Sequence, residues 1–135
     1  MHRTRHVLYR TIGLIAVLSS HAQAATTGGD RSAQGCIASA GYSWSQLRRE
    51  CLRLFETGVP LHNVRDPAAT GVAYVIGGGA TDPLELFLPD QATGILMFFR
   101  DGAWQDDDGR YSLSNDENDV LTVRDRQGNL LYSSR

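Results

Sequence analysis

The fold is decided in the stretch Val72-Ala-Tyr-Val-Ile-Gly-Gly-Gly-Ala-Thr-Asp-Pro-Leu-Glu-Leu-Phe-Leu88, where two short apolar runs are separated by a glycine-rich break. Apolar runs of this length between turn residues are typical of β-strands. The pattern repeats, and the predicted strands are 72–76, 84–88, 94–99, 110–113, 120–123 and 130–132. The short turns favour hairpins, because a parallel crossover needs a dozen or more residues. We therefore expect a curved antiparallel meander of five or six strands.

An amphipathic helix is predicted ahead of these strands. Ser43 and Gln46 have the spacing of a capping box. Gly58 and Pro60 are expected to end the helix, with Gly58 in the left-handed conformation that suits a glycine. One face carries apolar residues at helical spacing: Trp44, Leu47, Cys51, Leu54 and Phe55. This face would pack on the sheet, so the expected fold class is α+β, with one N-terminal helix on the meander.

Residues 1–24 have the pattern of a secretory signal peptide. A basic start leads into the apolar run Ile12-Gly-Leu-Ile-Ala-Val-Leu18, and Ala22-Gln-Ala24 is a small-x-small cleavage site. The alternative is an uncleaved membrane anchor, but the apolar run is about half the roughly 20 residues that a bilayer core requires. The sequence predicts a periplasmic or secreted bacterial protein that does not span the membrane after cleavage.

The remaining chain divides into a tail and one domain. Residues 25–34 contain no large apolar side chain and are predicted to be flexible, since they cannot offset the entropy of being ordered. Residues 35–135 are predicted to form a single α+β domain.

The net charge limits the kind of partner. All 13 basic residues are arginine, and the leader holds Arg3, Arg5 and Arg10, so the rest keeps ten arginines against 15 acids, about −5. Nucleic-acid binding is not expected, because it needs clustered basic residues that displace counterions. A basic protein partner is the better match.

Cys36 and Cys51 are the two cysteines of the chain. In an exported protein they are expected to form a structural disulfide. A redox or metal role would require a shorter spacing or further His and Cys ligands, and the predicted mature chain offers only His62. Nucleophilic catalysis by a serine or cysteine needs a neighbouring base, and His62 is the one histidine that could serve. We therefore expect no catalytic residue, no cofactor and no enzymatic activity.

Acidic residues gather in the turns between residues 101 and 119. They suggest three interpretations: a solvated acidic surface, an electrostatic face for a cationic protein, or calcium ligands, although the EF-hand spacing is not met. Trp104 is either a lid on the core or an interface anchor. The candidate partner-binding residues are Trp104, Asp106, Asp107, Asp108, Asp116 and Glu117.

Gly77-Gly-Gly79 is a second candidate feature. Glycine loops can cradle phosphate through bare backbone amides. Here no Gly-Lys-Ser sequence follows and a strand is predicted next, so the run is interpreted as a flexible hairpin loop.

Two resemblances follow from these residues. The segment Cys36-Ile-Ala-Ser-Ala-Gly-Tyr-Ser-Trp-Ser45, with Cys51 after it, resembles a segment of small exported bacterial proteins of undefined activity. Leu84-Glu-Leu-Phe-Leu-Pro89 and Gly128-Asn-Leu-Leu-Tyr132 look like the same group. In size, acidity, single disulfide and strand-rich C-terminal part the chain is similar to periplasmic lysozyme inhibitors. The resemblance implies an exported helix-plus-sheet domain and carries over no functional residue.

The leading functional hypothesis is a protein-binding module of the cell envelope, an inhibitor or immunity-like protein against a cationic cell-wall hydrolase or toxin. One alternative is a structural envelope component that self-associates through an edge strand at 94–99. The second alternative is a calcium-binding exported domain.

Overall fold

We describe residues 30–135 in a computed structural model of the protein. The predicted signal peptide, its cleavage site and residues 25–29 of the predicted tail lie outside this part. The N-terminal elements are a 3₁₀ turn η1 (Ala38–Ala40), strands β1 (Tyr42–Ser45) and β2 (Glu50–Arg53), and a short helix α1 (Leu54–Thr57). The later strands are β3 (Val59–Asn63), β4 (Ala73–Gly77), β5 (Leu84–Phe87), β6 (Ile95–Arg100), β7 (Ala103–Gln105), β8 (Tyr111–Asn115), β9 (Leu121–Asp125) and β10 (Leu130–Ser133).

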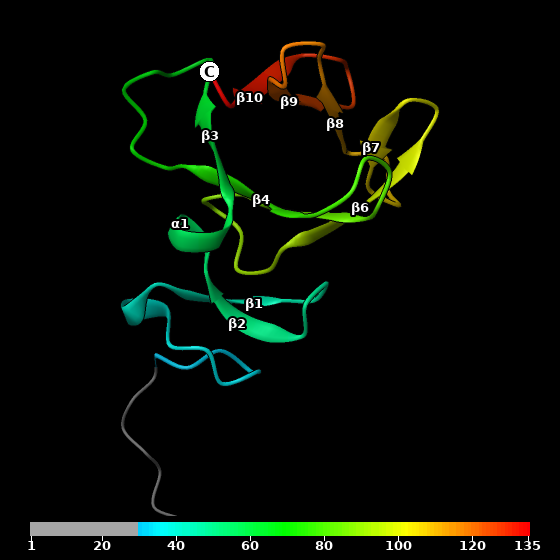
Figure 1. The fold of residues 1–135 in the computed structure, drawn as a ribbon. Coiled ribbons are helices and arrows are strands. Elements are labelled where there is room, and N and C mark those ends of the chain that lie inside the picture. Colours follow the sequence, from blue (N-terminus) through cyan, green and yellow to red (C-terminus); the bar gives the residue numbers. More distant parts are fainter. Residues whose placement is uncertain (1–29) are drawn as a thin grey trace, which may run out of the picture.

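Strands β3 to β10 form a closed antiparallel barrel (Figure 1). Each strand pairs with the next in sequence, and β10 closes the ring by pairing with β3, where Tyr132 lies opposite Asn63. Because every connection is a hairpin, the loops alternate between the two ends of the barrel. One end carries loops 78–83, 101–102 and 116–120, and the opposite end carries loops 64–72, 88–94, 106–110 and 126–129.

The barrel interior is the main hydrophobic core. An eight-stranded barrel is just wide enough for side chains to fill, and alternate residues of each strand point into it. In β5, for example, Leu84 and Leu86 belong to this core, while Phe87 packs outside it. The buried interior residues are Leu61, Ala73, Val75, Leu84, Leu86, Leu88, Ile95, Met97, Trp104, Leu113 and Val123.

The α+β prediction is wrong, because the segment expected to form an amphipathic helix is a β-hairpin. In this hairpin Tyr42 lies opposite Arg53 and Trp44 lies opposite Cys51. Within residues 30–135 the only α-helix is α1, which has four residues, and the only other helical element is the three-residue 3₁₀ turn η1. Gly58 follows the last helical residue, as predicted, but its φ of −95° is not left-handed.

Contacts with the barrel explain why the hairpin forms. Leu52 of β2 packs against Ile76 and Phe87 on the outer face of the barrel, in a second, smaller core. Ser45 is fully buried on β1 and bonds to a barrel side chain. A period of two brings Ser45 and Leu52 to the barrel, and these tertiary contacts outweigh the weak helix propensity of the segment.

Glu85 anchors the hairpin to the barrel. Its side chain points outward from β5 and is fully buried. The Ser45 hydroxyl donates to its Oε2 (2.6 Å), the Gln46 N–H donates to its Oε1 (2.9 Å), and the Leu47 N–H donates to its Oε2 (3.3 Å). Gly94 lies against this carboxylate, and a Cβ on Gly94 would come within 2.4 Å of Glu85 Oε1. The hairpin turn is therefore held by one buried acid.

The sheet is larger than predicted. All six predicted strands are present, as β4, β5, β6, β8, β9 and β10. The two further barrel strands are β3, which contains Pro60 and His62 in the stretch expected to be a helix stop and a polar connector, and β7, which has only three residues around Trp104. These two strands close the barrel in place of an open meander of five or six strands.

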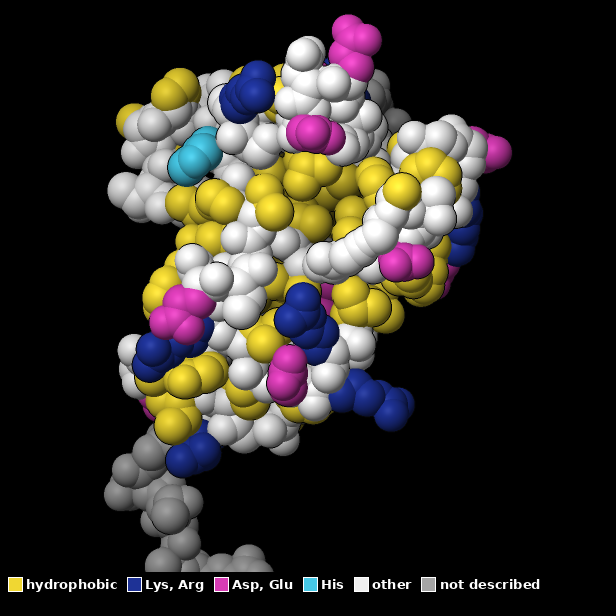
Figure 2. Space-filling model, viewed as in Figure 1, with side chains coloured by type: hydrophobic (Ala, Val, Ile, Leu, Met, Phe, Trp, Pro, Cys, Tyr) yellow, Lys and Arg dark blue, Asp and Glu magenta, His cyan; other side chains and the backbone are white. Residues whose placement is uncertain are grey.

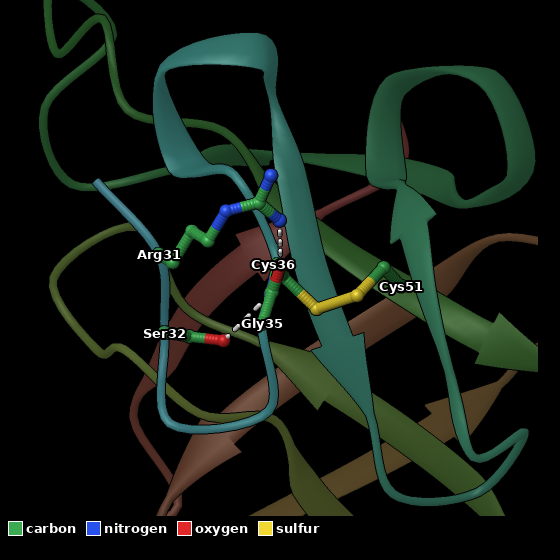
Figure 3. The surroundings of a disulfide bond; sticks show 5 residues. All are labelled: Arg31, Ser32, Gly35, Cys36 and Cys51. Carbon is green, nitrogen blue, oxygen red and sulfur yellow. Dashed lines mark hydrogen bonds between the residues drawn. A yellow bond between two sulfur atoms is a disulfide. The ribbon is translucent and has the colours of Figure 1, made fainter. Parts of the chain in front are cut away.

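The predicted disulfide between Cys36 and Cys51 is confirmed, with a Cα–Cα distance of 5.5 Å (Figure 3). It ties the segment before η1 to β2. The turn ahead of Cys36 is closed by the Ser32 hydroxyl, which accepts from the Cys36 N–H (3.1 Å), and by Arg31, which donates to the Gly35 carbonyl (3.0 Å). Residues 30–34 of the predicted tail thus lie against the hairpin. None of the helices in residues 30–135 has the length and hydrophobicity for a membrane crossing.

Candidate functional site

A cavity of about 400 Å³ opens at the barrel end that carries loops 78–83, 101–102 and 116–120. We call this end the acidic mouth. Figure 2 shows hydrophobic side chains on the floor of a hollow and acidic side chains around it. Its apolar lining residues are Val59, Val75, Leu84, Phe99, Trp104 and Leu121. An apolar hollow of this size is the usual form of a binding site for one small ligand or one inserted side chain.

Trp104 forms one wall of the cavity. It is only 7% exposed, and its indole N–H donates to the Asp82 carbonyl (2.8 Å). Its ring meets Phe99 edge to face, with 5.0 Å between centroids. Phe99 itself is 36% exposed at the mouth. Trp104 is therefore a buried wall of the core and also a lining residue of the cavity, so neither sequence interpretation describes it alone.

The glycine run 77–79 lines the cavity. It joins β4 to β5 as a hairpin loop. A Cβ on Gly77 would lie 2.2 Å from a methyl carbon of Leu84, and Gly79 has a left-handed φ of +92°. Gly78 differs, since a Cβ there would meet nothing within 4 Å. The loop can thus lie across the cavity without filling it.

Five exposed carboxylates lie on the loops at this end of the barrel. They lie on the three loops of the acidic mouth, which contain no basic residue: Asp82, Asp101, Asp116, Glu117 and Asp119. Within residues 30–135 none of the five belongs to an ion pair. Arg135 donates to the Asn118 carbonyl (3.4 Å), and Arg100, the last residue of β6 before Asp101, pairs with Asp107. The mouth therefore carries an excess of negative charge around an apolar floor.

The predicted acidic triplet Asp106–Asp108 lies at the opposite end and is largely neutralised. Asp106 is only 4% exposed and accepts from Arg110 Nε (3.1 Å) and from the Tyr111 N–H (2.9 Å). Asp107 pairs with Arg100 (2.8 Å), and Arg110 also reaches Asp108 (3.7 Å). The triplet holds the β7–β8 turn. The structure thus places Asp116 and Glu117 on a loop at the barrel end whose cavity Trp104 lines, while Asp106, Asp107 and Asp108 lie on the loop at the opposite end.

Tyr132 and Tyr111 pack on the core near the opposite end, where Asp90 also lines a smaller hollow. Burial is the main cause that raises the pKa of Tyr132, and the charges of Asp90 and Tyr111 raise it further. A raised pKa means that the folded state holds the phenolic proton more tightly than the unfolded chain.

This shift predicts an alkaline loss of stability. The contribution of Tyr132 is complete below the unfolded pKa of about 10 and is lost as pH rises through the higher folded pKa. We expect Tyr132→Phe to flatten the fall in the free energy of unfolding above about pH 10. Urea unfolding at a series of alkaline pH values checks this. An unchanged slope in the variant would contradict it.

Two structural findings concern the functional alternatives. Strand β6, proposed as a free edge for self-association, is hydrogen-bonded to β5 on one side and β7 on the other. In the part of the chain that the structure describes, no three His, Cys, Asp or Glu side chains gather closely enough to hold a metal ion. The predicted lone histidine, His62, is exposed on the outside of β3.

Sequence reasoning missed the cavity, because its walls come from strands that are neighbours only in a closed barrel. The turn residues at 78–83 and 101–102 were visible as turns, but nothing local places Asp82 and Asp101 beside Asp116. A comparison of the chain with known proteins found no matching family model, no matching curated protein and no matching solved structure.

Proposed function

We propose that the protein is an exported protein-binding module that holds a cationic partner at its acidic mouth, as an inhibitor or immunity-like protein of a basic cell-wall hydrolase or toxin. One observation carries the proposal: an apolar cavity opens at the barrel end whose loops hold five exposed carboxylates, and these have no ion-pair partner in residues 30–135. Such a surface suits a basic protein that presents an apolar side chain.

The two parts of the mouth have different roles in this proposal. The carboxylates attract and orient a basic surface over several ångströms, which raises the association rate and favours basic partners. The cavity takes one apolar side chain from that surface. Burial of such a side chain stabilises the complex by roughly 1.5–3 kcal/mol, which is the usual contribution of a central anchor.

The charge of the chain and its predicted export agree with this role. Without the predicted leader the net charge is about −5. A rigid barrel also keeps the loops of the mouth in place, so less ordering entropy is lost on binding. A protein of this kind can block a hydrolase by covering its cleft.

The first test removes charge from the mouth. In Asp116→Asn/Glu117→Gln/Asp119→Asn the amides keep the local geometry, because Asp116 Oδ1 accepts from the Asn118 and Val120 N–H groups and Asn has the same oxygen. We expect affinity for a basic lysozyme to fall about tenfold at low salt, mainly in the association rate, with a flatter salt dependence. Surface plasmon resonance across a panel of basic lysozymes measures both.

A matched control is available at the opposite end. Asp107→Asn/Asp108→Asn also removes acidic charge from exposed positions, but away from the mouth. It should leave affinity and salt dependence unchanged. Equal weakening in both variants, or no binding by any basic lysozyme in the panel, would contradict the proposal.

The same experiment tests the cavity with Gly78→Phe. Gly78 has open space for a side chain, so the ring can cover the mouth without strain in the loop. We expect loss of binding with an unchanged free energy of unfolding. The control is Ala69→Phe, an exposed position in the loop 64–72 at the opposite end, which should bind normally.

A further inference from the structure

A second groove lies on the N-terminal hairpin, away from the acidic mouth. It has a volume of about 370 Å³ and lies between the segment 30–34, strand β1 and the loop 88–94. The side chains that matter for its chemistry are Asp30, Gln34, Tyr42, Trp44, Gln91 and Thr93. None of these residues is used by the proposed function.

The floor of the groove is aromatic. Tyr42 and Trp44 are two positions apart on β1, so they share one face of the strand, at a spacing of about 6.6 Å. Both are half-buried. Ser45 lies on the other face of β1, toward the barrel, which leaves this aromatic face for the groove. Arg53 stacks on the Tyr42 ring at 4.9 Å and helps to fix its orientation.

The walls of the groove are polar and hold free hydrogen-bonding groups. Gln34 and Thr93 are exposed, and their side chains bond to no other described residue. The Trp44 indole N–H likewise has no acceptor in residues 30–135. Asp30 accepts from the Ser39 N–H (3.0 Å) and from the Ser39 hydroxyl, and a carboxylate has about four acceptor sites, so one remains for a ligand. These groups can donate to and accept from hydroxyl or amide groups of a ligand.

The groove carries little net charge and is built in advance. The charged residues of its lining are Asp30 and Arg31, and their opposite charges cancel. The wall formed by residues 30–34 is held in place by the disulfide and by the turn ahead of Cys36 (Figure 3). A balanced charge does not suit the cationic protein proposed for the mouth, and a preformed wall lowers the entropy lost on binding.

From these features we propose that the groove binds a neutral oligosaccharide. Sugar rings have C–H faces that stack on aromatic rings, and they carry hydroxyls that pair with carboxylate, amide and hydroxyl side chains. Tyr42 and Trp44 supply rings at strand spacing, and both walls supply the polar partners. The ligand class is a chain of uncharged pyranose sugars, bound along β1.

The test uses the chain from Ala25 onward, with its disulfide intact, and two soluble probes: the tetramer of N-acetylglucosamine and the tetramer of glucose. Isothermal titration calorimetry measures the dissociation constants at millimolar probe concentrations. We expect at least one probe to bind. Trp44→Ala should weaken that binding at least tenfold, in line with the loss of a stacking platform of about 1.4 kcal/mol or more.

A second variant keeps the test decisive if Trp44→Ala does not fold. Gln34→Ala/Thr93→Ala changes two exposed side chains and should weaken binding severalfold with the free energy of unfolding unchanged. Reduction of the disulfide should abolish binding, since it frees one wall. Asp116→Asn/Glu117→Gln/Asp119→Asn at the acidic mouth should bind the same probe with the affinity of the natural chain, so this result and that for the proposed function are independent. Failure of both tetramers to bind, or binding that both groove variants keep, would overturn the inference.

Discussion

Glu85→Ala is expected to lower the free energy of unfolding by about 3–5 kcal/mol, the largest effect of any single substitution considered for this chain. The alanine removes the acceptor of three donors: the Ser45 hydroxyl and the N–H groups of Gln46 and Leu47. Ser45 is fully buried, so water cannot replace the lost acceptor without opening the hairpin. The variant also leaves a cavity where the carboxylate met Gly94.

The control for this prediction is Glu85→Gln. The amide oxygen still accepts one hydrogen bond, and the amide nitrogen can donate to the Ser45 oxygen, so the loss should be less than half of that in Glu85→Ala. Urea unfolding measures both variants, and hydrogen exchange of the Gln46 and Leu47 amides locates the change. An alanine variant as stable as the glutamine variant would show that the carboxylate does not hold the hairpin.

Glu85 also shows why the fold was only partly predictable from the sequence. In Leu84-Glu-Leu-Phe-Leu88 the alternation places the glutamate on the face opposite the core, where an exposed acid is the normal outcome. It is buried because residues 45–47, forty positions earlier, cover that face. The six predicted strands follow from local pattern alone. The burial of an outward-facing acid depends on a long-range contact that no local pattern contains.

The error in the first third of the chain has the same cause. Trp44, Leu47 and Cys51 are spaced as on a helix. The same segment also fits the two-residue period of a strand, in which Ser43 and Ser45 share one face with their cross-strand partners Leu52 and Glu50. The disulfide and the Glu85 contacts select the hairpin. Similarly, β3 contains a proline and β7 is only three residues long, so neither has a strand signal of its own. They form strands because each is hydrogen-bonded to a neighbouring strand on both sides.

The sequence indicated that the candidate site is acidic, but it did not indicate which acidic residues lie at the same end of the barrel. The count of acids and the turn residues between 101 and 119 indicated an acidic surface, and Asp116 and Glu117 lie on a loop at the barrel end whose cavity Trp104 lines. Asp106 and its two neighbours could not be separated from them, because their partners Arg100 and Arg110 look like ordinary surface arginines in the sequence. Successive hairpin loops lie at opposite ends of the barrel. This arrangement places part of the acidic run 101–119 in a neutralised turn and the rest at the charged mouth.

The second large effect is expected on removal of the disulfide. Cys36→Ser/Cys51→Ser should lower the free energy of unfolding by about 3 kcal/mol, because the bond closes a loop with a sequence separation of 15 and restricts the unfolded chain. The barrel does not contain either cysteine, so its strands should keep their hydrogen-exchange protection while residues 30–53 lose theirs. Urea unfolding of the variant, and of the natural chain with and without reductant, measures the effect. A loss below about 0.5 kcal/mol would contradict it.

A double-mutant cycle connects this result to Glu85. The disulfide and the buried carboxylate hold the same hairpin from opposite faces: Cys51 on the outer face opposite Trp44, and Glu85 beneath the turn. When the hairpin leaves the barrel, the Glu85 hydrogen bonds are lost, whereas the disulfide joins two residues of the N-terminal segment and persists. Without the disulfide the segment is less restricted, so the hairpin leaves the barrel more readily and the Glu85 hydrogen bonds contribute less to stability. We therefore expect Glu85→Ala in the Cys36→Ser/Cys51→Ser background to cost at least about 1 kcal/mol less than in the natural chain. Full additivity would mean that the two groups stabilise separate units. In that case the hairpin would stay docked on the barrel after reduction of the disulfide. Reduction should nevertheless abolish sugar binding.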